Sequence, residues 1–132
     1  MSTSSASQQA GDSELATVVR ELEALIEGAS TPNWDGYGAQ PARPGAVEEA
    51  RTVLRILPRE CLAPQPCVEP DGSVGLEWHV RPGWTYVLTV SGRGQIEYAG
   101  LFGDGETHGR ERLGESLPPL VAEHLRRVAS PE

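Results

Sequence analysis

Lysine is absent from this chain, and all 11 basic residues are arginines. Without lysine the protein cannot form a Schiff base with a carbonyl substrate, and it cannot build the lysine-containing phosphate cradle of a P-loop. The sequence also lacks a dinucleotide-binding glycine motif, a nucleophile elbow and a His-Glu-x-x-His motif. These absences remove the common sequence signatures of catalysis and favour a protein that binds a partner.

Positive charge is scarce, because 19 acidic residues give a formal net charge of −8. Nucleic-acid binding needs a basic stripe that neutralises phosphates, so we expect a protein partner with a basic surface instead. No apolar run approaches the roughly 18 residues of a membrane span. The N-terminus has neither the basic start nor the apolar stretch of a secretory signal. We therefore expect a cytoplasmic protein with no membrane partner.

Only two cysteines are present, Cys61 and Cys67, in a proline-rich segment. Their spacing matches no common zinc motif, no second pair accompanies them, and a disulfide is unusual in a cytosolic protein. Asp104, Glu106 and His108 alternate potential metal ligands in a glycine-rich segment that imposes no geometry. We therefore predict two ordinary thiols, a solvated loop at 100–114, and neither metal nor cofactor.

The length of 132 residues fits one domain. Residues 1–12 contain almost no apolar side chains and are predicted to form a disordered tail, which leaves a single domain at 13–129. Apolar residues recur at helical spacing in three segments: 13–27, 44–57 and 116–128.

Between residues 66 and 100 the apolar period changes to two. Short turns separate the alternating segments, so consecutive strands should pair antiparallel. The resulting order ααββββα predicts an α+β fold, in which an antiparallel meander of three to four strands has helices packed on one face.

Residues 33–41 (NWDGYGAQP) form a first distinctive segment. Asp35 can accept a hydrogen bond from the backbone amide two residues on, and the glycines permit a tight turn. Trp34 and Tyr37 then anchor a structural loop against the sheet or the helix ends. Alternatively, the two aromatic side chains contact a partner, or Asp35 transfers protons in an aromatic pocket.

Residues 71–79 (DGSVGLEWH) form a second distinctive segment, a turn followed by a strand. Alternation places Glu77 and His79 on the face opposite Leu76 and Trp78, and simple hairpin registers add Glu97 to that face. This face is a solvated surface, a partner-docking surface, or an acid–base or metal site that needs a third group from a loop.

Together, residues 34–41, residues 70–78 and the later segment 96–98 (IEY) resemble a group of small uncharacterised bacterial proteins. In that group a Trp-Asp-Gly-x-Gly-Ala-x-Pro loop precedes a helix and a glycine-rich strand ending in Glu-Trp. The resemblance covers about residues 30–100. It implies no established activity, although small accessory proteins of this kind often lie beside defence or toxin–antitoxin genes.

The sequence therefore favours a non-enzymatic interaction module with an antitoxin-like, inhibitor or accessory role. We assign its partner-binding surface to Trp34, Asp35, Tyr37, Glu77, His79 and Glu97. One alternative is a small hydrolase-like enzyme, which requires Asp35, Glu77 and His79 to converge on one pocket. The other is a homo-oligomeric structural protein that pairs through strand edges.

Overall fold

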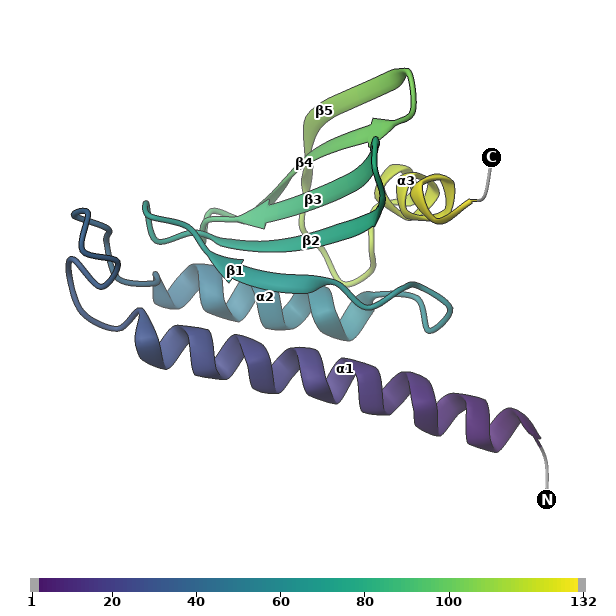
Figure 1. Ribbon diagram of the computed structural model, residues 1–132, viewed down its shortest axis with the longest axis horizontal. Helices are drawn as coiled ribbons and strands as arrows, with labels where there is room; N and C mark the ends of the chain where they lie inside the picture. The colour runs from purple at the N-terminus through teal and green to yellow at the C-terminus, as the bar shows by residue number, and fades with distance from the viewer. Residues whose placement is uncertain (1–2, 131–132) are drawn as a thin grey trace.

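The chain from residue 65 to residue 112 forms a five-stranded antiparallel sheet in the order β1-β2-β3-β4-β5. Figure 1 shows its arrangement in the computed structural model. The structure describes residues 3–130, and side chains from residue 14 to residue 130. The elements are α1 (Thr3–Gly28), α2 (Pro44–Ile56), β1 (Gln65–Val68), β2 (Val74–Arg81), β3 (Trp84–Val90), β4 (Gln95–Phe102), β5 (Gly105–Arg112) and α3 (Pro119–Ala129). The predicted α+β class is confirmed, with three helices and an antiparallel meander.

The sheet has five strands where the sequence predicted three to four, and the difference is β5. The solvated loop expected at 100–114 is wrong, because β4 continues to Phe102 and Gly103 turns the chain directly into β5 with φ 74°. Exposed positions in β5 alternate with half-buried positions that hold Gly105, Thr107 and Gly109. This strand therefore has no apolar periodicity from which it could be recognised.

The first helix begins at Thr3, earlier than the expected start at residue 13. Residues 1 and 2, the first part of the predicted disordered tail, lie outside the described residues. The tail at 1–12 and the single domain at 13–129 stay predictions. The last helix begins at Pro119, three residues after the predicted start at 116, because prolines at 118 and 119 fit only at its first turn.

One face of the sheet carries the core. Helix α1 packs against β1, α2 against β2 and β3, and α3 against β3 and β4 (Figure 1). The sheet residues under these helices include Val74, Leu76, Trp78, Tyr86, Leu88, Val90 and Ile96, each at most 2% exposed. Burying a side chain of this size contributes about 1.5–3 kcal/mol, so this face holds the fold together.

A polar pair lies within this core. His124 of α3 is 8% exposed, and its Nδ1 lies 2.7 Å from the hydroxyl of the fully buried Tyr86. The rings of Tyr98 and Phe102 also pack against His124.

Among the described residues, no helix combines the length and the apolar content needed to cross a bilayer.

Candidate functional site

The loop at 33–40 is closed by hydrogen bonds to its own backbone. Oδ1 of Asp35 accepts from the amides of Tyr37 and Ala39, at 2.8 and 3.1 Å. Asn33, at φ 62°, donates its amide to the carbonyl of Ala39 and accepts the Gly38 amide on its side chain. The predicted hydrogen bond from a backbone amide to the carboxylate of Asp35 is therefore present, and this carboxylate stabilises the conformation of its own loop.

The loop is also fixed to the turn between β1 and β2. The amide of Gln40 donates to the carbonyl of Pro70 at 2.7 Å, and Nε1 of Trp34 donates to the carbonyl of Gln40 at 2.6 Å. A Cβ at Gly72, which has φ 89°, would lie 2.7 Å from a backbone oxygen at residue 41. Tyr37, by contrast, is 92% exposed. The indole of Trp34 thus bonds within its own loop, and its packing against the sheet or the helix ends stays a prediction, whereas Tyr37 points into solvent and does not anchor the loop.

The second part of the candidate site is the sheet face that none of the helices described in residues 3–130 covers, and we call it the open face. Its central residues are Thr85 and Val87 of β3 and Ala99 and Leu101 of β4, and Leu101 is 44% exposed. Its rim residues are Glu77 and His79 of β2, Glu97 of β4, and Glu106, His108, Arg110 and Arg112 of β5. The predicted face of Glu77, His79 and Glu97 is therefore formed, with Glu97 two strands away from Glu77.

The open face is shallow. A depression of about 200 Å³ lies over its centre, lined by residues that include Val87, Ala99 and Leu101. At its β5 side, Arg110 lies 3.6 Å from the carboxylate of Glu97, an exposed ion pair. Such pairs contribute little to stability, so these charges remain available to a partner.

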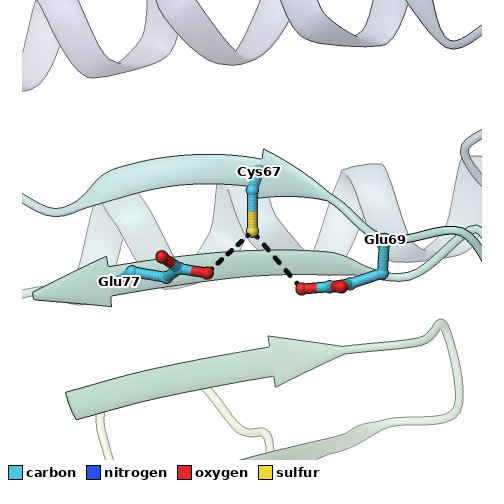
Figure 2. A group of neighbouring side chains, drawn as sticks. All are labelled: Cys67, Glu69 and Glu77. Carbon is cyan, nitrogen blue, oxygen red and sulfur yellow. Dashed lines mark hydrogen bonds between the residues drawn. The ribbon is translucent and has the colours of Figure 1, made fainter. Parts of the chain in front are cut away.

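At the other side of the open face, a thiol, two carboxylates and an imidazole meet. Sγ of Cys67 in β1 lies 3.2 Å from Oε2 of Glu77 and 3.4 Å from Oε2 of Glu69, as Figure 2 shows. The other oxygen of Glu77 accepts from Nε2 of His79 at 2.8 Å. This bond to His79 holds the pKa of Glu77 below its usual 4.5. Burial, together with the two carboxylates, raises the pKa of the Cys67 thiol well above its ordinary value.

The sequence interpretation missed Cys67 and Glu69 at this site. It took the two cysteines as ordinary thiols by their spacing along the chain, whereas the ligand-type groups come together across the β1–β2 hairpin. The useful signal was the spacing of two residues between Cys67 and Glu69, and between Glu77 and His79, on either side of a short turn. Residues two apart in a strand lie on the same face of the sheet.

Two other predicted groupings are not formed. The carboxylate of Asp35 accepts hydrogen bonds within its own loop, whereas Glu77 bonds to His79 and to Cys67 on the β1–β2 hairpin. Glu106 and His108 occupy alternate positions of β5, with Asp104 in the preceding turn. Among the described residues, a group of three or more ligand atoms within 4.8 Å of one another occurs only at Cys67, Glu69 and Glu77.

Comparisons of the chain with protein-family models, with curated proteins and with solved structures found no match. The resemblance of residues 34–41 and 70–78 to small bacterial proteins therefore stays an expectation. The fold and the site define an α+β protein with one helix-covered sheet face, one open face, and a loop at 33–40 that is hydrogen-bonded to the turn between β1 and β2.

Proposed function

We propose that this protein is a non-enzymatic, cytoplasmic protein-binding module that docks its partner on the open face, with the 33–40 loop as a second contact. One observation carries the proposal. The helices cover one side of the sheet, and the other side presents exposed or half-buried apolar side chains, among them Val87, Ala99 and Leu101, inside a polar rim. An apolar centre surrounded by a polar rim is the usual arrangement of a protein–protein interface.

The charge of the rim indicates the kind of partner. Glu69, Glu77, Glu97 and Glu106 place four carboxylates on or beside the open face, against the guanidinium groups of Arg110 and Arg112. The whole chain carries a formal charge of −8. A partner with a basic surface would be attracted by this field, and its association rate would fall as salt is added.

The 33–40 loop supports the same function. Tyr37 exposes a large aromatic side chain on a backbone that Asp35 already holds in place. An exposed tyrosine on an ordered loop loses little entropy on binding, and tyrosine is common among residues that dominate interface energy. This arrangement suits an antitoxin-like, inhibitor or accessory role.

Neither alternative function gains support from the contacts. The carboxylate of Asp35 is engaged by two amides of its own loop, which does not favour a hydrolase built on Asp35, Glu77 and His79. The outer edge of β5 carries charged side chains such as Glu106 and Arg110 at alternate positions. Charged edge strands resist pairing with another copy, so strand-edge oligomerisation is not favoured.

A pair of matched leucines tests the proposal. Leu101 lies on the open face and is 44% exposed, whereas Leu120 lies on α3 and is 40% exposed. The partner is first identified by cross-linking in the native host, and its dissociation constant is then measured with purified proteins. We expect Leu101→Arg to weaken binding at least about tenfold, because a charge is forced into a desolvated centre, and Leu120→Arg to leave it unchanged. Glu106 lies opposite residue 101 and accommodates the new arginine in the folded sheet.

The opposite pattern would contradict the proposal. If Leu101→Arg binds like the wild type while Leu120→Arg loses the partner, the docking surface lies on the helical side of the molecule. Tyr37→Ala tests the loop separately, with an expected loss of about tenfold in affinity. Circular dichroism spectra of all variants check that the fold is intact.

A further inference from the structure

We propose that Cys67, Glu69 and Glu77 form a binding site for a divalent transition-metal ion, with Zn²⁺ as the best match. The site lies on the β1–β2 side of the open face, where Figure 2 shows the thiol between the two carboxylates. The inference is independent of the protein-binding function proposed above, because it depends on donor atoms and not on a partner.

The distances fit tetrahedral zinc. Zinc binds thiolate sulfur at about 2.3 Å and carboxylate oxygen at about 2.0 Å, which places sulfur and oxygen about 3.5 Å apart in a tetrahedron. Sγ of Cys67 lies 3.2 Å from the oxygen of Glu77 and 3.4 Å from the oxygen of Glu69. The three ligand atoms lie within 4.8 Å of one another. Side-chain rotations that bring the two carboxylate oxygens to the roughly 3.3 Å spacing of a tetrahedron would complete the ligand set.

The proton count of the cluster also points to a cation. The thiol of Cys67 has one proton, yet carboxylate oxygens of both Glu69 and Glu77 face its sulfur. Only one of them can accept that proton, and the other faces sulfur lone pairs. A divalent ion attracts all three groups at once. When it binds, the S–H bond breaks, a metal–sulfur bond forms, and one proton leaves to solvent for each ion bound.

Two neighbouring residues prepare the site. His79 donates from Nε2 to one oxygen of Glu77, and the other oxygen of that carboxylate faces Cys67. Partners of this kind orient ligands in metal centres. Gly75 lies opposite Cys67 in the β1–β2 pair, and a Cβ there would be 2.8 Å from Sγ and 3.3 Å from Oε2 of Glu69. Glycine at this position leaves the space in which the sulfur and the carboxylate meet.

The donor set selects the ion. Mg²⁺ and Ca²⁺ prefer sites made only of oxygen atoms, whereas a thiolate with carboxylates suits the borderline-soft Zn²⁺ and Co²⁺. Three protein ligands leave one position of a tetrahedron to water. The site is therefore expected to bind Zn²⁺ and Co²⁺ and to reject Mg²⁺.

The test uses the full chain, kept reduced, with Co²⁺ as a spectroscopic probe. We expect one Co²⁺ per chain, a sulfur-to-cobalt charge-transfer band in the near ultraviolet, loss of that band when Zn²⁺ is added, and release of about one proton per ion. Cys67→Ser should abolish the band. The matched control is Cys61→Ser, which removes the chain's other thiol and should leave the band and the affinity unchanged.

Carboxylate and imidazole variants complete the test. Glu77→Gln should weaken binding at least tenfold, whereas Glu97→Gln, on the same face but outside the cluster, should not. His79→Gln should retain the band but weaken binding about 10- to 100-fold, as expected for a positioning residue. The proposal is overturned if the wild type shows no charge-transfer band, if Cys67→Ser keeps it, or if Cys61→Ser loses it. If Cys67→Ser does not fold, the two glutamate variants decide. The proposal is then overturned if Glu77→Gln binds Co²⁺ as tightly as Glu97→Gln does.

Discussion

Replacing Tyr86 with phenylalanine removes one oxygen atom from a ring that is completely buried. That oxygen lies 2.7 Å from Nδ1 of His124, whose side chain is 8% exposed. Burial lowers the pKa of His124 and raises the pKa of Tyr86, so both groups are neutral at physiological pH. The tyrosine O–H therefore donates to an unprotonated Nδ1, and Tyr86→Phe leaves that nitrogen without its donor.

The expected loss of stability follows from this unpaired acceptor. A buried polar group that loses its partner costs about 1–3 kcal/mol, a large part of a total stability of roughly 5–15 kcal/mol. Urea unfolding followed by tryptophan fluorescence, to which the buried Trp78 contributes, measures the change. Replacing both polar partners with apolar groups avoids the unpaired acceptor. The double variant Tyr86→Phe/His124→Leu should therefore recover part of the loss.

The same pair predicts how stability depends on pH. The folded-state pKa of His124 lies below the ordinary 6.5, mainly because of burial and in part because of Arg127, against the opposite effects of Glu123 and Glu111. As the pH falls below about 6.5, His124 binds a proton in the unfolded chain but not yet in the folded protein. The stabilisation is complete above the unfolded pKa and is lost as the pH falls toward the folded value. His124→Leu should therefore remove the part of the decline in unfolding free energy between pH 8 and pH 5.5 that His124 causes.

Two results would refute the reasoning. One is a Tyr86→Phe unfolding free energy within about 0.5 kcal/mol of the wild type at pH 8, well below the range expected for an unpaired buried acceptor. The other is a decline in stability between pH 8 and pH 5.5 that is the same in the wild type and in His124→Leu. The first would show that water or another group satisfies Nδ1 of His124. The second would assign the pH dependence to other groups.

Two further substitutions test packing and a long-range contact. Gly100→Ala would place a Cβ 2.6 Å from Cδ1 of Tyr86, and this overpacking should cost about 1–3 kcal/mol in thermal unfolding; an unchanged midpoint would show that the ring can move aside. Glu49→Ala removes the α2 carboxylate that accepts from the amides of Gly92 and Gly94, at 2.8 and 2.6 Å. It should cost about 1 kcal/mol and speed hydrogen exchange at both amides, whereas Glu49→Gln should retain part of the protection.

The sequence was most informative where apolar residues repeat. The period of two in residues 71–79 predicted that Leu76 and Trp78 of β2 share one face, and both are buried in the core. Strand β5 could not be found in this way, because its half-buried positions hold two glycines, a threonine and a glutamate. Gly109 is one of them, and a Cβ there would lie 2.5 Å from the hydroxyl of Tyr98. The side chain of Tyr98 in β4 thus fills the space at Gly109, where an apolar residue would otherwise have marked the strand.

The 33–40 loop shows a similar division. The hydrogen bond from the Tyr37 amide to the carboxylate of Asp35 could be predicted, because it joins residues two positions apart. The exposure of Tyr37 could not, because it depends on where the loop meets the turn between β1 and β2. That contact joins segments about thirty positions apart in sequence, through the hydrogen bond from the Gln40 amide to the Pro70 carbonyl. Local chemistry is readable from local sequence, whereas the surface that a loop presents depends on its tertiary neighbours.

The cluster at Cys67 combines both kinds of information, because a local turn sets its register. Oδ1 of Asp71 accepts from the amide and the hydroxyl of Ser73, which closes a short turn and pairs Val68 with Val74. Cys67 then lies opposite residue 75, with Glu77 as its diagonal neighbour, and long side chains reach across such diagonals. A one-residue slip in this hairpin would move the residues of one strand to the opposite face and separate the thiol from the carboxylate. The segment 71–79 therefore acts first through its turn, and any chemistry at Cys67 depends on the backbone register which that turn maintains.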